Sequence, residues 1–270
     1  MTPQSLSYHA TGVDVKFNEE HDGRIMAALS KTQIDKLGER LKEGSASQDD
    51  LRMLDDYRDS FSDVLMPVLE VLRRHGFEPT SRIAKTTQSI VGKLQREKTL
   101  RLSRMQDIAG CRVIVHDITE QDQFVATLQR DFPDSNVIDR RQKPSHNYRA
   151  VHVIAKISGK LVEIQIRTPL QHLWAKVSEQ LSDVIDREIK YGGGSESWQA
   201  TLTNAAQAIN MYEICQKELP VKKQSLQEDS PQYNEKKRLH EEAEQTLKLC
   251  EDGLTRILHG ALEELKEQRS

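Results

Sequence analysis

The pattern of apolar and polar positions predicts mainly helices in the first hundred residues. Residues 1 to about 20 carry little pattern and are expected to form an arm or a short strand, whereas Gly23–Lys42 reads as short helices. In Gln48–Arg74 the apolar residues recur every three or four positions, which predicts one longer helix. Gly76 is expected to end that helix with a left-handed cap, and 86–98 is a further short helix.

The period then changes in the middle of the chain. A compact β-branched run, CRVIV, predicts a strand, and a Ser-Gly pair between two apolar runs signals a hairpin. The expected elements are a strand at 111–115, a helix at 118–131, a strand at 136–140, paired strands at 150–157 and 160–168, and a helix at 169–186. Mixed helices and strands with an internal antiparallel hairpin indicate an α+β fold rather than a doubly wound one.

The last third of the chain is polar and helical. A Tyr-Gly-Gly-Gly-Ser stretch at 191–195 looks like a hinge, and helices are expected at 198–218 and 235–267 with a break around Pro220–Pro231. The last helix carries a leucine stripe, for which packing on its own domain is favoured over a coiled-coil partner surface because the heptads are not sustained. These features suggest three parts: an arm with short helices at 1–45, a central domain at 46–192 and a helical extension at 193–270.

Composition narrows the function only a little. The chain of 270 residues is 36% hydrophobic and 30% charged, with a net charge of −3, so a polyanion would have to be held by a local basic patch. Three cysteines are too few and too scattered for a disulfide framework or a zinc site, and Cys111 is expected in the core. No apolar run is long enough to span a membrane and no leader pattern is visible, so no membrane partner and a cytoplasmic location are expected.

The predicted hairpin places chemistry on one face of the sheet. If Ser158-Gly159 is the turn, Ile154 lies opposite Glu163 and His152 opposite Gln165, and alternation brings His152, Glu163, Gln165 and Arg167 to the same face. Taken alone, this is the pattern of an ordinary half-solvated sheet. A nearby aromatic residue and basic residues instead suit phosphates and a stacked base; they are Arg140, Arg141, Lys143, Tyr148 and Arg149.

Two further segments carry candidate groups. Asp107 precedes the CRVIV strand, where an acid alone is most simply a turn residue, but together with Glu163 it would offer hard oxygen ligands for Mg²⁺ beside phosphates. Lys85, Ser89 and Lys93 recur at four-residue spacing. Such a basic face is usually just solvated, yet at a helix N-terminus it would cradle a triphosphate. No Walker A or G-x-G-x-x-G sequence is present.

Together these segments resemble the RelA/SpoT alarmone synthetase family over about residues 50–195. The family's motifs look like Arg82 to Leu94 (R-I-A-K…S-I-V-G-K-L), Asp107 to Val115 (D-I-A-G-C-R-V-I-V), Lys143 to His152 (K-P-S-H-N-Y-R-A-V-H) and Glu163 to Thr168 (E-I-Q-I-R-T) with the helix after it. Two departures stand out. Arg82 lies three residues before Lys85 instead of two, and Asn147 replaces a usual glycine, although asparagine tolerates left-handed backbone.

The resemblance implies an α+β, nucleotidyltransferase-like fold and a Mg²⁺-dependent enzyme that transfers pyrophosphate from ATP to the 3′-hydroxyl of GDP or GTP. The implied catalytic residues are Glu163, Asp107 and Gln165, with Asp107 and Glu163 as metal ligands. The implied ATP-binding residues are Arg82, Lys85, Ser89, Lys93 and Arg112. The implied acceptor-binding residues are Lys143, Tyr148, Arg149, His152, Arg167 and His172.

Two alternative functions stay open at this level. The first is a toxic small synthetase that pyrophosphorylates the 3′ end of tRNA, for which basic pairs such as Arg140-Arg141 and Lys222-Lys223 would bind the acceptor stem. The second is a catalytically inert nucleotide-sensing module. Nothing resembles the family's hydrolase domain, so a small stand-alone synthetase is expected. Its C-terminal helices would form a homo-oligomer or bind an antitoxin or a regulator.

Overall fold

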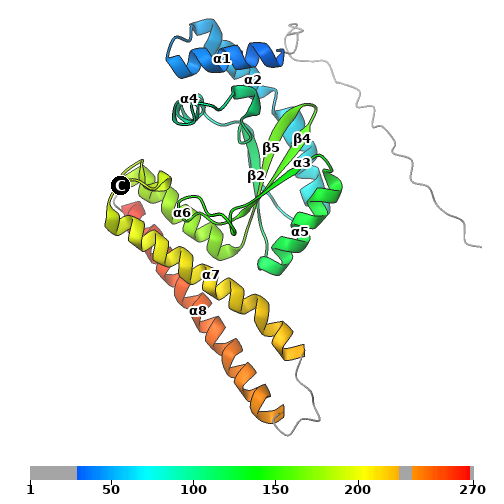
Figure 1. Cartoon of the computed structure of the whole chain (residues 1–270), viewed down its shortest axis with the longest axis vertical. Coiled ribbons are helices and arrows are strands. Elements are labelled where there is room, and N and C mark those ends of the chain that lie inside the picture. Colours follow the sequence, from blue (N-terminus) through cyan, green and yellow to red (C-terminus); the bar gives the residue numbers. More distant parts are fainter. Residues whose placement is uncertain (1–28, 225–232, 268–270) are drawn as a thin grey trace, which may run out of the picture.

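The computed structural model describes residues 29–224 and 233–267 (Figure 1). Most predicted elements are present, including the helix at 118–131 with its predicted bounds. The arm predicted at 1–20 lies outside the described residues. In chain order the elements are α1 (Lys31–Glu43), α2 (Gln48–Asp59), α3 (Ser62–Arg74), β1 (Thr80–Arg82), α4 (Thr87–Arg96), the 3₁₀ turn η1 (Leu102–Arg104), β2 (Ala109–Ile114), α5 (Ile118–Asp131), β3 (Asn136–Asp139), β4 (Val151–Ile157), β5 (Lys160–Arg167), α6 (Pro169–Val184), the 3₁₀ turn η2 (Ile189–Tyr191), α7 (Glu196–Gln224) and α8 (Tyr233–Glu267).

The strands form one five-stranded sheet in the order β1-β2-β5-β4-β3. Only the β2–β5 pair is parallel, and the other three pairs are antiparallel. The predicted α+β fold with a mixed, mainly antiparallel sheet flanked by helices is therefore confirmed. The edge strand β1, with all three residues exposed, was missed because it is too short and polar to show a period.

The register of the β4–β5 hairpin is the one predicted from its turn. Ile154 pairs with Glu163 and His152 pairs with Gln165. Ser158 and Gly159 have φ values of 49° and 80°, and a two-residue turn with positive φ at both positions matches the right-handed twist of the strands. The turn thus decides which side chains share a face of the sheet.

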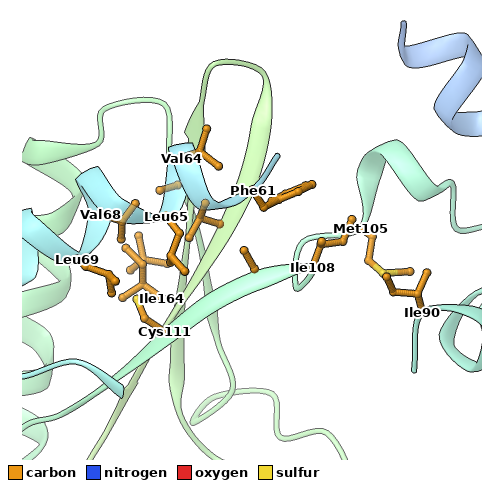
Figure 2. Packing of buried hydrophobic residues seen from close by; sticks show 14 of the residues in the cluster. Phe61, Val64, Leu65, Val68, Leu69, Ile90, Met105, Ile108, Cys111 and Ile164 are labelled. Atoms are coloured by element: carbon orange, nitrogen blue, oxygen red, sulfur yellow. The ribbon is translucent and has the colours of Figure 1, made fainter. Parts of the chain in front are cut away.

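The apolar face of the sheet packs against α3 and α5. Figure 2 shows side chains of α3, among them Leu65 and Val68, lying against Cys111 of β2 and Ile164 of β5. Cys111 is buried, as expected for a core residue. Because this face is filled, the polar face is the one left for chemistry.

The prediction of one continuous helix over 48–74 is wrong, because the chain bends at Ser60 and Phe61. The carbonyl of Ser60, which would accept from Val64 in a continuous helix, instead accepts a hydrogen bond of 2.5 Å from Lys160 of the hairpin. Val64 donates to Phe61 instead. The bend also allows the Phe61 side chain to enter the core, where it is 1% exposed. A tertiary contact has overridden the helical period.

A second core joins α6, η2, α7 and α8. Leu258, Leu262 and Leu265 of the predicted stripe are buried in it, so the interpretation of α8 as a helix that packs on its own domain is confirmed. In Figure 1, α7 and α8 lie side by side and cover α6. Because α6 shares this core, the division predicted at residue 192 runs through one packed cluster.

The connection between the last two helices differs from the prediction. α7 continues to Gln224, past Pro220, so the helix ends later than the predicted break. The remainder of the predicted break, at 225–232, lies outside the described residues. Among the described residues, no helix has the length and apolar character needed to cross a membrane.

Candidate active site

The polar face of the sheet gathers its functional groups from three neighbouring strands. The antiparallel register brings His152 beside Gln165, and the parallel register adds Arg112 on the other side of Gln165. The centre of this face is not solvated, since His152 is 8% and Arg167 is 3% exposed. An ordinary half-exposed sheet would leave these polar groups in water. Their burial indicates a pre-formed polar site.

Five of the predicted side chains form a closed ring of contacts, called here the five-residue ring. Arg167 Nε donates to the Tyr148 hydroxyl (3.1 Å), which lies 2.8 Å from His152 Nε2. His152 Nδ1 lies 2.9 Å from Glu163 Oε1. Gln165 closes the ring, because its Nε2 donates to Glu163 Oε2 (2.7 Å) and its Oε1 accepts from Arg167 Nη2 (2.8 Å).

The ring keeps the Glu163 carboxylate charged. Burial would raise the pKa of Glu163, but the contacts with His152 outweigh burial and lower it below its ordinary value. An ionised carboxylate against an imidazole is suited to accept a proton from a hydroxyl group within hydrogen-bond distance. Arg167 Nη1 is buried without a hydrogen-bond partner among the described residues, so a donor is left for an anionic ligand.

Asp107 is the centre of a second cluster, next to the start of β2. Lys85 Nζ and Lys93 Nζ lie 2.5 Å and 2.8 Å from its two carboxylate oxygens. Burial would raise the pKa of Asp107, but the two ammonium groups lower it to about 2. Arg82 joins from β1 by donating to the Asp107 carbonyl at 3.1 Å. Three cations thus converge on one acid.

The same cluster lies beside the N-terminus of α4. Thr86 caps this helix by accepting from the Ser89 amide at 3.2 Å, and its hydroxyl contacts the Ser89 hydroxyl at 2.8 Å. Ser89 is exposed. The sequence-predicted residues Arg82, Lys85, Ser89, Lys93 and Asp107 are therefore brought together around a helix N-terminus, which is a favourable position for phosphate groups.

Gly110 connects the two clusters. It pairs with Glu163 across β2 and β5, and it follows Asp107 by three residues. A Cβ at Gly110 would lie 2.8 Å from the Glu163 carbonyl oxygen and 3.5 Å from its Cβ, so glycine is needed for the close approach of β2 and β5 at this point. The negative charge on Asp107 acts to raise the pKa of Glu163, although less than burial does.

Asp107 and Glu163 fit a magnesium site that is shared with a substrate. The described residues contain no group of three or more acidic, histidine or cysteine side chains that would hold a metal. Mg²⁺, however, is commonly held by one or two carboxylates and completed by substrate phosphates and water. The two ionised carboxylates of Asp107 and Glu163 agree with that second kind of site.

Arg112 and His172 lie at the other side of the ring. Arg112 Nη1 lies 3.3 Å from His172 Nδ1. Burial and the neighbouring guanidinium groups of Arg112 and Arg167 lower the pKa of His172 to about 4. His172 is therefore neutral at pH 7 and accepts a hydrogen bond from Arg112. Arg112 Nε is buried without a partner among the described residues.

Two predicted residues do not join this group. Arg149 turns toward α7, where its Nη2 donates to Asn210 (2.5 Å), and its Nη1 donates to the Arg141 carbonyl (2.8 Å). Lys143 is exposed on the loop before β4. In the same loop, Asn147 has φ of 67°, so the expected left-handed backbone is confirmed at the position where the family usually has glycine.

Tyr148 is placed at the site, where its ring contacts Arg167, His152 and Trp174. The Arg167 guanidinium carbon lies 5.1 Å from the ring centroid. Burial raises the pKa of the Tyr148 hydroxyl. Stacking of a base on Tyr148 stays a prediction.

Sequence reasoning missed a group of polar residues behind the site. These residues connect β3, α5, α6 and α7, and they are Gln121, Asp122, Asp139, Gln171, Asn210, Glu213 and Lys217. Glu213, for example, is 2% exposed. Polar residues on helices usually mark a solvated face, so nothing in the sequence singled them out.

Comparisons with known proteins agree with the motifs. Residues 81–182 match the family model described as a region found in RelA / SpoT proteins. An uncharacterized protein of Mycobacterium tuberculosis is 40% identical over 129 residues, covering 47% of this chain and 47% of that protein. The chain thus spans about half the length of these mycobacterial relatives.

Two proteins of Bacillus subtilis are also similar. The GTP pyrophosphokinase YjbM is 28% identical over 174 residues, which is 59% of this chain and 77% of that protein. The crystal structure of small alarmone synthetase 1 matches with a TM-score of 0.47 at 25% identity, over 66% of this chain and 99% of that one. Residues 81–182 therefore contain a region of the kind found in RelA / SpoT proteins.

Proposed function

We propose that this protein transfers the β,γ-pyrophosphate of ATP to the 3′-hydroxyl of GDP or GTP and releases AMP. The relation to a GTP pyrophosphokinase supports this reaction. The observation that carries it is the meeting, near Gly110, of the basic cluster around Asp107 and the buried Glu163–His152 pair. Such transfers depend mainly on in-line positioning and on neutralisation of charge.

The ATP half of the site consists of Arg82, Lys85, Ser89, Lys93 and Asp107. In the structure the two ammonium groups bind Asp107. When ATP is bound, they exchange part of this contact for phosphate oxygens, with the N-terminus of α4 beside them. Burial lowers the pKa of Lys85, so its ammonium group gains from a second anion.

The acceptor half consists of the five-residue ring and His172. The resemblance assigned Arg112 to ATP binding, but Arg112 lies against His172 and is placed with the acceptor half in this proposal. The unpartnered nitrogens of Arg112 and Arg167 provide donors for the phosphates of the guanosine nucleotide. The acceptor 3′-oxygen attacks the β-phosphorus of ATP, so a new oxygen–phosphorus bond forms. The bond from the β-phosphorus to the oxygen bridging to the α-phosphorus breaks, and that oxygen leaves with AMP.

Glu163 receives the proton of the attacking hydroxyl. Its carboxylate is held by His152 and Gln165, which fix its orientation and stabilise its charge before the proton arrives. Asp107 and Glu163 would hold Mg²⁺, which, when bound, neutralises phosphate charge and organises the triphosphate. A general base that is positioned in this way contributes roughly 10² to 10⁴ in rate.

The test incubates the purified protein with Mg²⁺ and ATP labelled at the γ-phosphate. GDP, GTP, ATP and bulk tRNA are offered separately, with Glu163→Gln as the inactive control. Label on GDP or GTP, lost in the variant, is the expected result. Label on tRNA alone would show the toxin reaction instead. Absence of transfer from a folded protein to every acceptor would contradict the proposal and favour an inert module.

A further inference from the structure

Helix α7 holds the chain on both sides of Tyr148, a residue of the acceptor half. Its Thr203 accepts a hydrogen bond from Asn147 at 2.8 Å, and its Asn210 accepts one from Arg149 at 2.5 Å. These are the residues directly before and after Tyr148. Trp174 of α6 donates to the Leu202 carbonyl of α7 at 2.9 Å. Tyr148 thus projects into the site from a loop that α7 fixes at two points.

Glu213 of α7 fixes the start of α6 in the same way. It accepts from the hydroxyl of Thr168 (2.6 Å) and from Gln171 Nε2 (2.9 Å and 3.1 Å). Thr168 follows Arg167, and Gln171 precedes His172. Burial raises the pKa of Glu213, although these hydrogen bonds oppose the effect. A buried acid of this kind is retained only where its partners satisfy it.

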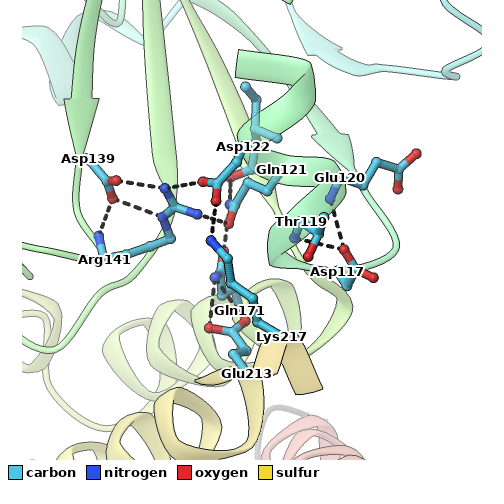
Figure 3. Close-up of polar contacts among 11 residues, drawn as sticks. Asp117, Thr119, Glu120, Gln121, Asp122, Asp139, Arg141, Gln171, Glu213 and Lys217 are labelled. Atoms are coloured by element: carbon cyan, nitrogen blue, oxygen red, sulfur yellow. Dashed lines mark hydrogen bonds and ion pairs between the residues drawn. The ribbon is translucent and has the colours of Figure 1, made fainter. Parts of the chain in front are cut away.

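A directed chain of hydrogen bonds extends from Glu213 across the back of the sheet (Figure 3). Arg141 Nη1 donates to Gln121 Oε1 (3.1 Å), Gln121 Nε2 donates to Gln171 Oε1 (3.0 Å), and Gln171 donates to Glu213. Gln121 is 0% and Gln171 is 1% exposed. Every donor points from the guanidinium toward the carboxylate, so each bond strengthens the next.

An exposed ion pair lies beside this chain of hydrogen bonds. Lys217 of α7 lies 2.7 Å from Asp122 of α5, and Asp122 also pairs with Arg141. The Lys217 and Asp122 side chains are 49% and 40% exposed, so this bridge contributes little. The hydrogen bonds of Glu213 and Asn210 therefore connect α7 to the acceptor half, in addition to the apolar packing of α7 on α6.

The ATP half is held differently. Lys85 and Lys93 bind Asp107, Arg82 binds the Asp107 backbone, and Ser89 binds Thr86. These contacts lie between residues 82 and 107, and Arg58 of α2 adds hydrogen bonds to the Lys85 carbonyl (2.8 Å) and the Thr87 hydroxyl (3.3 Å). Among the described residues, none of these partners comes from α7. The support that α7 gives is confined to the acceptor half.

We infer that α7 positions the guanosine-nucleotide half of the site, with Asn210 and Glu213 as positioning residues that act through Arg149, Thr168 and Gln171. This inference rests on the proposed function. A helix that only covered the second core would need apolar contacts, such as those of Leu202 and Ile209. It would not need a buried acid, Glu213, hydrogen-bonded to the residues beside Arg167 and His172. Through α7, the C-terminal helices α7 and α8 would change the affinity for the acceptor without changing the affinity for ATP.

The test compares Asn210→Ala with Asn210→Asp, since the aspartate keeps an oxygen that accepts from Arg149. Glu213→Gln places an amide donor against the Gln171 donor. The matched control is Gln207→Ala, an exposed residue of the same helix. KM for GDP and for GTP is measured at saturating ATP, and KM for ATP at saturating acceptor.

We expect Asn210→Ala and Glu213→Gln to raise the acceptor KM about three- to tenfold, as for partial loss of a hydrogen bond to a charged group. The ATP KM stays unchanged, and Asn210→Asp and Gln207→Ala behave as the wild type. Equal changes in both KM values, or no change in either, would overturn the inference, because a merely structural role does not distinguish the two substrates.

A second readout does not need activity. Amide hydrogen exchange is followed in the wild type, Asn210→Ala and Glu213→Gln, together with the melting temperature. The inference predicts faster exchange at 145–150 in the first variant and at 168–172 in the second, with exchange at 87–96 unchanged. Uniform acceleration, or none, contradicts it. If the wild type transfers nothing to GDP or GTP, the proposed function fails, while this readout still decides whether α7 holds these segments.

Discussion

The ATP half and the acceptor half of the site are built by different means. The ATP half comes from one continuous stretch, residues 82–107, in which Lys85 and Lys93 meet Asp107. The acceptor half takes its groups from β2, β4, β5, α6 and the loop before β4, and it depends on hydrogen bonds from α5 and α7. The functional groups of the ATP half come from one stretch, with support from Arg58 of α2, whereas those of the acceptor half are assembled from distant segments.

This difference has a mechanical consequence. A salt-bridged cluster on one helix and one strand end stays together when a distant helix shifts. The residues next to the ring, Arg149, Thr168 and Gln171, are held by Asn210 and Glu213, so the ring responds to a change in α7. Changes in the C-terminal helices are therefore expected to alter acceptor binding first.

The largest effect is expected from Glu163→Gln, which removes the charge at the junction of both halves. Transfer should fall roughly 10³-fold or more, because a general base and a metal ligand are lost together. The fold should persist, since glutamine keeps the shape and the contact with Gln165. Steady-state kcat and circular dichroism measure both, with exposed Asp183→Asn as the control. A variant with near-normal kcat would remove Glu163 from the mechanism.

Lys93→Met should weaken binding of ATP without affecting binding of the acceptor. It removes one of the two ammonium groups on Asp107 while keeping the length of the side chain. The KM for ATP should rise about tenfold or more, as for loss of a charge-assisted phosphate contact, and the KM for GDP should stay within about twofold. A rise in the acceptor KM alone would show that the halves are assigned the wrong way round.

Tyr148→Phe should weaken use of the acceptor without affecting binding of ATP. The hydroxyl links Arg167 to His152, and its loss opens the five-residue ring without creating a large cavity. Acceptor kcat/KM should fall about three- to tenfold, in line with one buried hydrogen bond, while the ATP KM is unchanged. Competition kinetics with both substrates varied measures this, and an equal loss toward ATP would count against the separation.

Acid unfolding tests whether the ion pairs of Asp107 stabilise the ATP half. The pKa of Asp107 falls from its ordinary 3.8 to about 2, so its ion pairs stabilise the fold at neutral pH. That stabilisation, about 2 kcal/mol, is lost as the pH falls from about 4 to about 2. Asp107→Asn should therefore unfold more easily than the wild type in urea at pH 7, with the difference shrinking toward pH 2. A difference that is constant with pH would show that the carboxylate charge is not involved.

The smallest effect is expected from Asn147→Gly. Glycine takes φ of 67° more easily than asparagine but loses the hydrogen bond to Thr203, so the change in unfolding free energy should stay below about 1 kcal/mol. The acceptor KM should rise only about twofold, since Arg149 and Asn210 still hold the loop. Loss of acceptor binding would mean that the Thr203 contact is the main one.

The sequence predicted well those features that depend on neighbours along the chain. The hairpin register followed from the Ser158-Gly159 turn, and the shared face of His152, Glu163 and Gln165 followed from alternation. The four-residue spacing of Lys85 and Lys93 predicted that their ammonium groups lie on one face. It did not predict that both bind Asp107.

Features that depend on distant contacts were not predictable. The bend at Ser60 arises from Lys160 of the hairpin, and the turning of Arg149 away from the site arises from Asn210 of α7. Glu213 looks like any other surface acid in an amphipathic helix until α6 and α7 are packed together. Such pairings follow from tertiary packing, which no local period encodes.

The most direct test of the central claim uses ATP labelled on both the β- and the γ-phosphate, with Mg²⁺ and GDP or GTP as acceptor. The account predicts a product that carries both labels in a 1:1 ratio, with one AMP released for each product and with Glu163→Gln inactive. Transfer of the γ-label alone, with ADP as the by-product, would contradict pyrophosphate transfer and identify an ordinary phosphotransferase.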